Sequence, residues 1–349
     1  MIDHSNGGEV SARLYLKRQG VRRDAMRLVT ETPIKVSMVS DADIKMTMQA
    51  TAEYDGEIDY FRDTLEPVLV FNGVEHPVGN YVIGGSVKES DGMRTWYQLT
   101  GFDLTQKARR HCAEERLYFP TGMKYTDAME QLLTLAGITN YLVEPSDFVM
   151  ATDREDWERG ENHLTIINAL LREMNYNTLY AGLDGIVRAT AYRTPTAQNV
   201  TVCYGVDGAK ILVPGARIEV DAFSHYNVFH YTCENPDLVN FFTAYSENSS
   251  AGNRFSTLNQ GRVPVFRKMD NAPSQHALQE ICDRERLESM IANNTIEFET
   301  GLNPAHSAFD VVAINKKEFN GIIKETEWSM ELHRGGVMRH KGKQAELEI

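Results

Sequence analysis

The stretch that decides the fold runs from Asp153 to Ala191 and reads DREDWERGENHLTIINALLREMNYNTLYAGLDGIVRATA. It predicts an acidic loop, a short buried helix and two strands joined by a tight turn. Asn162 is placed to cap the helix, because a side-chain oxygen there satisfies an orphan backbone N–H. Asp184-Gly185 predicts the turn, since both residues tolerate left-handed conformations. One helix face is apolar, with Leu164, Ile167, Leu170, Leu171 and Met174. The stretch therefore predicts a folded module, and it contains no motif for catalysis.

Residues 1–110 are mostly strand-like. Apolar and polar residues alternate over Val10 to Lys17 and again around Ile34 and Ile44, as they do on half-buried strands. An apolar run over Pro67 to Phe71 ends at Asn72-Gly73, which predicts a hairpin. With further strand signals near residues 81 and 95, this part has roughly five to seven short antiparallel strands, which is typical of a barrel or sandwich.

Helices are predicted at two further places. Thr126-Asp127 is interpreted as the capped start of a helix ending before Gly137, and Pro273 as the start of the longest helix. Residues 249–261 are interpreted as an exposed loop and 333–343 as a modest basic tail. Further strands are predicted at 178–191, 217–223, 227–232, 241–245, 295–299, 308–314 and 322–332.

The pattern as a whole predicts an α+β, mainly β fold in three parts, because 349 residues exceed one ordinary core. The first is a β domain, a barrel or a sandwich, over residues 1–110, and the second is a small α/β module over 111–195. The third is a second β domain over 196–349, with a helix near 273–293. In an alternative arrangement, strands after residue 195 partly complete the first barrel.

Composition excludes several classes of protein. The chain is 42% hydrophobic and 24% charged, as folded soluble proteins are, and has no apolar run of the ~18 residues that a membrane span needs. The N-terminus lacks the pattern of a signal peptide, so assembly in a cytoplasm is expected. A net charge of −13 argues against wrapping nucleic acid, which requires a basic face. It is compatible with DNA that passes by without being gripped.

The densest acidic cluster comprises Asp153, Glu155, Asp156, Glu158 and Glu161. Paired carboxylates catalyse glycoside hydrolysis, which makes a peptidoglycan hydrolase the alternative function. However, these charges share one short polar loop, and no apolar setting is evident that would raise a carboxyl pKa. We therefore predict a solvated loop whose Trp157 is buried in the core.

His225, His230 and Cys233 are the strongest candidates for a metal cluster. On a strand, positions 225 and 233 face one way and 230 the other, and no fourth ligand is evident. Cys112 beside His111 suggests a thiol nucleophile, yet adjacent residues on an extended chain point apart, so a buried or half-buried thiol is expected. No nucleotide-binding motif occurs. We predict no catalytic residue, no metal and no cofactor.

Aromatic residues are dense between positions 226 and 242. On strands that border a core, such side chains usually fill the core, and contacts between subunits are the next interpretation. The candidates for subunit contact are Tyr226, Phe229, Tyr231, Phe241 and Phe242.

Three ordered patterns carry a resemblance to a known family. The first is Trp157 and Gly160, the buried helix, Asn175-Tyr176-Asn177-Thr178-Leu179-Tyr180 and Asp184-Gly185. The second is Asn80-Tyr81-Val82-Ile83-Gly84-Gly85, leading into residues 96–104. The third is Glu234-Asn235-Pro236-Asp237, followed by residues 251–256 and by Gly261-Arg262. Together they resemble the baseplate hub proteins of phage tails and of phage-like contractile particles.

The resemblance implies a structural protein and not an enzyme. Such a hub has two tail-tube-like β-barrel domains per chain, and three chains form a ring around the tail channel. Implied partners are the tail tube protein, the central spike or tip protein and other baseplate proteins, with the tape-measure protein and transiting DNA in the channel. The implied location is the tail baseplate of a virion or phage-like particle. A receptor-binding tail tip or the hydrolase remains the alternative, and contractile and non-contractile tails both remain open.

Overall fold

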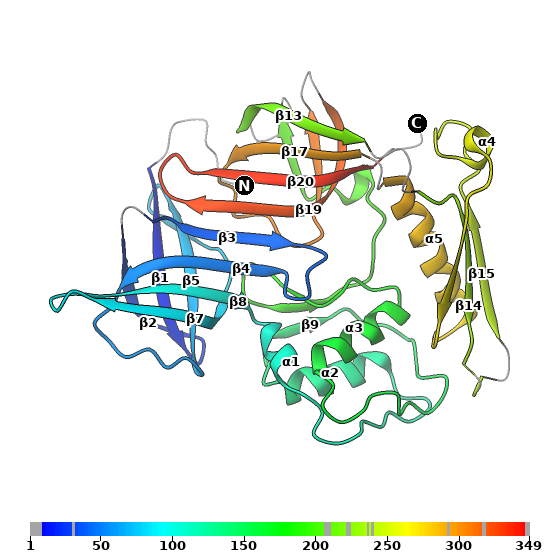
Figure 1. Ribbon diagram of the computed structural model, residues 1–349, viewed down its shortest axis with the longest axis horizontal. Helices are drawn as coiled ribbons and strands as arrows, with labels where there is room; N and C mark the ends of the chain where they lie inside the picture. The colour runs from blue at the N-terminus through cyan, green and yellow to red at the C-terminus, as the bar shows by residue number, and fades with distance from the viewer. Residues whose placement is uncertain are drawn as a thin grey trace.

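The computed structural model describes residues 9–29, 32–205, 211–220, 225–235, 237–238, 241–291, 294–315 and 319–345. The fold is mainly β, and most strands belong to one large sheet that changes direction along its length (Figure 1). The N-terminal strands are β1 (Val10–Arg18), β2 (Val21–Leu28), β3 (Ile34–Val39), β4 (Met46–Glu53), β5 (Asp63–Phe71), β6 (Val74–Pro77), β7 (Tyr81–Ser90) and β8 (Thr95–Asp103).

Six of these strands form a closed circuit of pairings, in the order β4-β2-β1-β5-β7-β8 and back to β4. Their side chains alternate between the interior and solvent, as the period of two along a strand requires. Leu14, Leu16 and Met48 point inward and are fully buried. The described strands after residue 195 do not enter this circuit. Among the described strands, the hydrogen-bonded link between the two sets is β3, which pairs with β4 on one side and with β19 on the other.

Two tight turns hold this part together, and one of them was not predicted. The hairpin at Asn72-Gly73 is confirmed, with φ values of 49° and 80°. Strand β2 was missed because its sequence, VRRDAMRL, is largely exposed and lacks apolar alternation. The signal was Gln19-Gly20, whose φ values of 50° and 80° form the turn that returns the chain from β1 into β2.

The α/β module has the predicted helix with the predicted cap. The Asn162 side chain accepts a hydrogen bond from the Thr165 backbone N–H at 2.9 Å, and the predicted apolar face is buried. For the helix predicted to begin at Thr126-Asp127, the predicted cap is wrong. The helix starts at Tyr125, and the side chain of its N-cap residue, Lys124, makes no capping hydrogen bond. In the Asp184-Gly185 turn, the left-handed residue is Gly185, with φ 76°. The elements are α1 (Gln106–Arg110), α2 (Tyr125–Leu135), β9 (Tyr141–Val143), α3 (His163–Glu173), β10 (Tyr180–Ala181) and β11 (Val187–Ala189).

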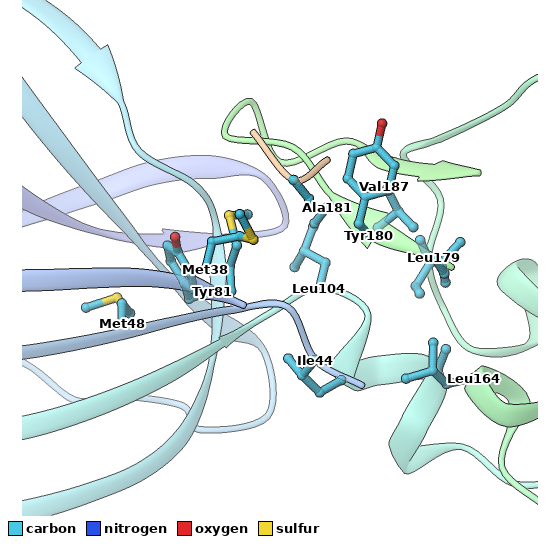
Figure 2. Close-up of a cluster of buried hydrophobic side chains, with 14 of the residues drawn as sticks. Met38, Ile44, Met48, Tyr81, Leu104, Leu164, Leu179, Tyr180, Ala181 and Val187 are labelled. Atoms are coloured by element: carbon cyan, nitrogen blue, oxygen red, sulfur yellow. The ribbon is translucent and has the colours of Figure 1, made fainter. Parts of the chain in front are cut away.

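One hydrophobic core runs from the strand circuit into the module without a break. Figure 2 shows Ile44 and Leu104 between the inward side chains of the strands and those of the module, such as Leu164 and Leu179. Because these parts share a core, they are expected to be stable together rather than as separate units.

The C-terminal half contains a second set of strands, in the order β12-β18-β19-β20-β17-β13. Part of it packs on a separate core, which includes Val202, Phe298 and Ile314, whereas Trp328 and Met338 belong to the first core. The predicted basic tail is wrong, since most of it forms β20, whose inward residues include Met338 and His340. The elements are the short 3₁₀ helix η1 (Ala197–Asn199), β12 (Val202–Gly205), β13 (Leu212–Val220), β17 (Asn294–Gly301), β18 (Val311–Asn315), β19 (Asn320–Leu332) and β20 (Val337–Ala345).

Between β13 and β17 the chain forms a three-stranded sheet of its own, in the order β15-β14-β16, which packs against the long helix α5. Residues 225–291 therefore lie outside the second strand set, although the sequence-based division joined the two. Part of the predicted loop at 249–261 is a short helix, and the last three residues of the strand predicted at 217–223 lie outside the described residues. The elements are β14 (Val228–Cys233), β15 (Phe242–Glu247), α4 (Thr257–Gln260), β16 (Pro264–Met269) and α5 (Gln275–Ile291).

None of the helices that the structure describes is long and apolar enough to span a membrane.

Candidate functional site

Three carboxylates of the acidic loop are bound by neighbouring groups of the chain. Asp153 accepts hydrogen bonds from the Thr121 backbone N–H and hydroxyl at 2.7 Å, and these bonds hold the pKa of Asp153 below its ordinary value. Glu155 lies 3.4 Å from Arg116, and Asp156 forms an ion pair with Arg154. A general acid for glycoside hydrolysis needs a raised pKa, and the shift at Asp153 has the opposite direction.

Trp157 is buried, as predicted, and its ring meets that of Phe119 edge-on with the centroids 5.6 Å apart. Behind it lies a buried ion pair that the sequence did not reveal. The guanidinium of Arg154 binds both carboxylate oxygens of Glu173, at 2.8 and 3.0 Å, and the Tyr125 hydroxyl donates to the same carboxylate. The loop is therefore anchored to α2 and α3 by its own arginine.

His225, His230 and Cys233 each have different surroundings. His225 Nε2 lies 2.5 Å from Gln260 Oε1, and the His230 ring stacks on Phe266 with 4.7 Å between centroids. Cys233 is fully buried in the core beneath α5. Cys112, which was expected to be buried or half-buried, is exposed.

The aromatic candidates for subunit contact divide into two groups. Phe229 and Tyr231 are buried in the core between the small sheet and α5, and Phe242 packs against that core from the side. Tyr226 and Phe241 are exposed, with 46% and 71% of their surface accessible. Of the five candidates, only these two are exposed and therefore accessible to a partner in the isolated chain.

The broad outer face of the C-terminal strands carries a regular pattern of charge. One cross-strand row runs through Glu327, Lys341, Glu297 and Arg217, on β19, β20, β17 and β13. The signs alternate, with Lys341 3.0 Å from Glu327 and Arg217 3.6 Å from Glu297. A hollow of about 610 Å³ lies along this face. The face is charged but balanced, because neighbouring strands supply opposite signs.

The densest buried polar cluster lies inside the C-terminal strands and consists of His306, Glu325 and His340. Both imidazoles lie within hydrogen-bonding distance of the Glu325 carboxylate on β19. His306 Nδ1 is 2.8 Å from one carboxylate oxygen, and His340 Nδ1 is 2.5 Å from the other. All three side chains are at least 98% buried. Among the described residues, this is the one group of three or more potential metal-ligating side chains whose donor atoms all lie within 4.8 Å of one another.

Four further buried groups surround this trio. The second ring nitrogen of each imidazole lies next to a hydroxyl. His306 Nε2 is 2.6 Å from the Tyr204 hydroxyl, and His340 Nε2 is 2.8 Å from the Thr300 hydroxyl. Asn303 donates to the Tyr204 hydroxyl at 3.0 Å. Asp310 Oδ2 lies 3.6 Å from His306 Nδ1, on the same side as Glu325. Seven polar side chains thus meet in the buried interior of the C-terminal strands.

Burial disfavours the charged form of each ionisable group in the cluster. Only a nearby group of opposite charge offsets this effect on the pKa. Burial lowers the pKa of His340 and raises the pKa of Asp310 to about 6. For His306 burial is the largest single effect and lowers the pKa, but the charge and hydrogen bond of Glu325, together with the charge of Asp310, raise the pKa overall. For Glu325, burial raises the pKa, and its histidine partners more than reverse that shift.

No short sequence motif predicts this cluster. Its residues come from the segment between β17 and β18, from β19 and from β20, so only the pairing of strands brings them together. A weak signal was present in β20, where Arg339, Lys341 and Lys343 occupy every second position and leave His340 on the inward side.

No protein-family model matches the sequence, and no curated protein matches it. Solved structures do match. A tail protein from Neisseria meningitidis has a TM-score of 0.66 at 12% identity, covering 96% of this chain and 97% of that one. The 43 kDa tail protein of prophage MuSo2 from Shewanella oneidensis has a TM-score of 0.63 at 14% identity, covering 96% and 99%.

A third match is a component of the type VI secretion system of Escherichia coli, whose description notes structural similarity to the T4 phage tail proteins gp27 and gp5. Its TM-score is 0.52 at 9% identity, and the match covers 95% of this chain and 77% of that one. The fold is therefore that of phage tail proteins, along almost the whole chain. The resemblance to baseplate hubs that the sequence motifs carried is confirmed at the level of the fold.

Proposed function

We propose that the chain is a structural component of a phage-type tail, and specifically a baseplate hub that joins the tail tube to the central spike or tip. The observation that carries the proposal is the fold shared with tail proteins over 96% of the chain. The buried His306, Glu325 and His340 and the acidic loop provide no open site for a substrate, which favours a structural role over catalysis.

The closed circuit of six strands is proposed as the first tube-like barrel, and the strand set from β12 to β13 as the second. Strand β3 supports this arrangement, because it pairs with β4 of the circuit and with β19 of the second set. A continuous strand face across both parts would let three chains present six such units to a tail tube.

The balanced charged face of β13, β17, β20 and β19 is proposed to line the channel. Alternating signs leave little net field, so the phosphates of transiting DNA would be neither gripped nor strongly repelled. Tyr226 and Phe241 are proposed to contact a neighbouring subunit or another baseplate protein, because exposed aromatic rings are enriched at such interfaces. The location that follows is the baseplate of a virion or phage-like particle.

Replacing all five carboxylates of the acidic loop (Asp153, Glu155, Asp156, Glu158 and Glu161) with Asn or Gln should leave tail assembly and infectivity or killing largely intact. Exposed ion pairs contribute only about 0–1 kcal/mol each, and Asn at position 153 still accepts from Thr121. The measurement is particle yield and activity, together with an assay for muropeptides released when the purified wild-type chain is incubated with peptidoglycan. Muropeptide release by the wild type, or normally assembled but inactive variant particles, would favour the hydrolase.

A further inference from the structure

We propose that His306, Asp310, Glu325 and His340 bind one structural divalent metal ion of the zinc class, held inside the C-terminal strand set. The cluster is separate from the proposed tail function and from the His225, His230 and Cys233 group. It also departs from the sequence-based expectation that the chain binds no metal.

The hydrogen bonds of Thr300 fix the first step of the argument. Its hydroxyl lies 2.8 Å from the Gly301 carbonyl and 2.8 Å from His340 Nε2, and when its single hydrogen points to the carbonyl it accepts from Nε2. In that arrangement His340 carries a hydrogen on Nε2, and a neutral His340 presents a bare lone pair at Nδ1. That lone pair faces Glu325 Oε1 at 2.5 Å. Two acceptor atoms at this distance repel each other unless a positive charge lies between them.

The charge of the surrounding groups favours a divalent ion over a proton. Two carboxylates, Glu325 and Asp310, lie within 3.6 Å of His306 Nδ1 and are at least 93% buried. Without a metal ion, balancing them takes two protons, which give imidazolium–carboxylate pairs or neutral acids. One divalent ion with two neutral imidazoles and two carboxylates leaves the buried cluster neutral.

The kind and placement of the donors fit zinc. Two imidazole nitrogens and two carboxylate oxygens are ligands that zinc accepts, and bonds of about 2.0–2.2 Å in a tetrahedron put the ligand atoms roughly 3.3 Å apart. The observed separations of 2.5, 2.8 and 3.6 Å bracket that value. Small shifts of His306, Glu325 and His340 would therefore open this trio around an ion. Asp310, which lies beside His306 but is not within 4.8 Å of all three donors, would move in as the fourth ligand. Four protein ligands leave no open position, which is the arrangement of a structural site.

Neighbouring groups also hold the imidazole donors in place. Each imidazole is oriented through Nε2 by a buried hydroxyl, of Tyr204 or Thr300, and such partners fix the ring of a ligating histidine. Next to Asp310, Phe309 has φ 63°, a left-handed conformation that bulky residues rarely adopt. Strain of this kind persists where the surrounding structure fixes a residue in place.

The test uses the full-length chain, purified without a metal-chelating tag, and measures metal content by mass spectrometry. We expect about one equivalent of zinc per chain, as a closed structural site requires. Glu325→Gln should lose it, while remaining folded by circular dichroism, because the Gln amide can donate to the bare Nδ1 of His340. His225→Asn, which changes a buried histidine outside the cluster, should retain the zinc content of the wild type.

A second readout does not depend on metal acquired during expression. Cobalt(II) titrated into chelator-treated wild-type chain should give the intense visible bands of tetrahedral coordination, saturating near one equivalent. Thr300→Val should weaken cobalt affinity by the ~10–100-fold that loss of a hydrogen bond to a ligating histidine brings. A folded wild-type chain that holds no zinc and gives no such bands would overturn the proposal, and so would a Glu325→Gln chain that keeps its zinc.

Discussion

Leu170→Asp is expected to abolish folding of the α/β module and, with it, incorporation of the chain into tails. Leu170 has no exposed surface and belongs to the core that joins the module to the strand circuit. An aspartate there would be buried without a partner, at a cost of several kcal/mol out of the roughly 5–15 kcal/mol that stabilises a domain. The measurement is soluble yield and thermal unfolding of the variant.

Thr165→Asp provides the matched control on the same helix. Thr165 is exposed and lies in the first turn of α3, where the helix dipole favours a negative charge. The free energy of unfolding of the Thr165→Asp variant should stay within about 1 kcal/mol of the wild-type value. A Leu170→Asp chain that folds and assembles normally would mean that this helix face does not pack as observed.

The second large effect is expected from Glu173→Ala, which should destabilise the chain by roughly 3–5 kcal/mol. The substitution leaves the Arg154 guanidinium, only 4% exposed, without the carboxylate that binds it through two hydrogen bonds. It also removes the acceptor of the Tyr125 hydroxyl. Chemical denaturation of the purified chain measures the change in the free energy of unfolding.

Two further variants separate a buried charge from an ordinary loss of contacts. Glu130→Ala removes an exposed carboxylate from α2 and should change stability by no more than about 0.5 kcal/mol. The double variant Arg154→Met, Glu173→Leu should recover most of the loss, because it removes both charges and fills the space. If Glu173→Ala alone is within 1 kcal/mol of the wild type, the ion pair does not hold the loop as described.

Local signals predicted the local structure well. Asn162 caps α3, Asn72-Gly73 makes its hairpin, and Trp157 lies in the core, because each depends on a few neighbouring residues. Strand β2 was missed because its stability comes from pairing with β1 and β4 rather than from its own apolar pattern. The same limit applies to β20, whose alternating basic residues were interpreted as a tail.

The candidate site could not be predicted from the sequence, for a related reason. His306 and His340 meet at Glu325 only after β19 has paired with β20 and the segment before β18 has folded back. No spacing rule connects residues from three separate segments. The residues that the sequence did suggest, His225, His230 and Cys233, are close along the chain but contact different neighbours in the fold.

The hub proposal predicts a particular symmetry in the assembled tail. A ring that connects a six-fold tube to a three-fold spike must contain three chains, each offering two tube-like units. Its interfaces should exceed the ~1,600 Å² of a standard contact, as permanent assemblies do.

The direct measurement is an electron cryomicroscopy reconstruction of intact tails, computed without imposed symmetry at the junction of tube and tip. We expect three copies of the chain around the axis at that junction, with the face of β13, β17, β20 and β19 toward the channel and Tyr226 and Phe241 at contacts. Six copies, a single copy, or a position away from the junction would contradict the account.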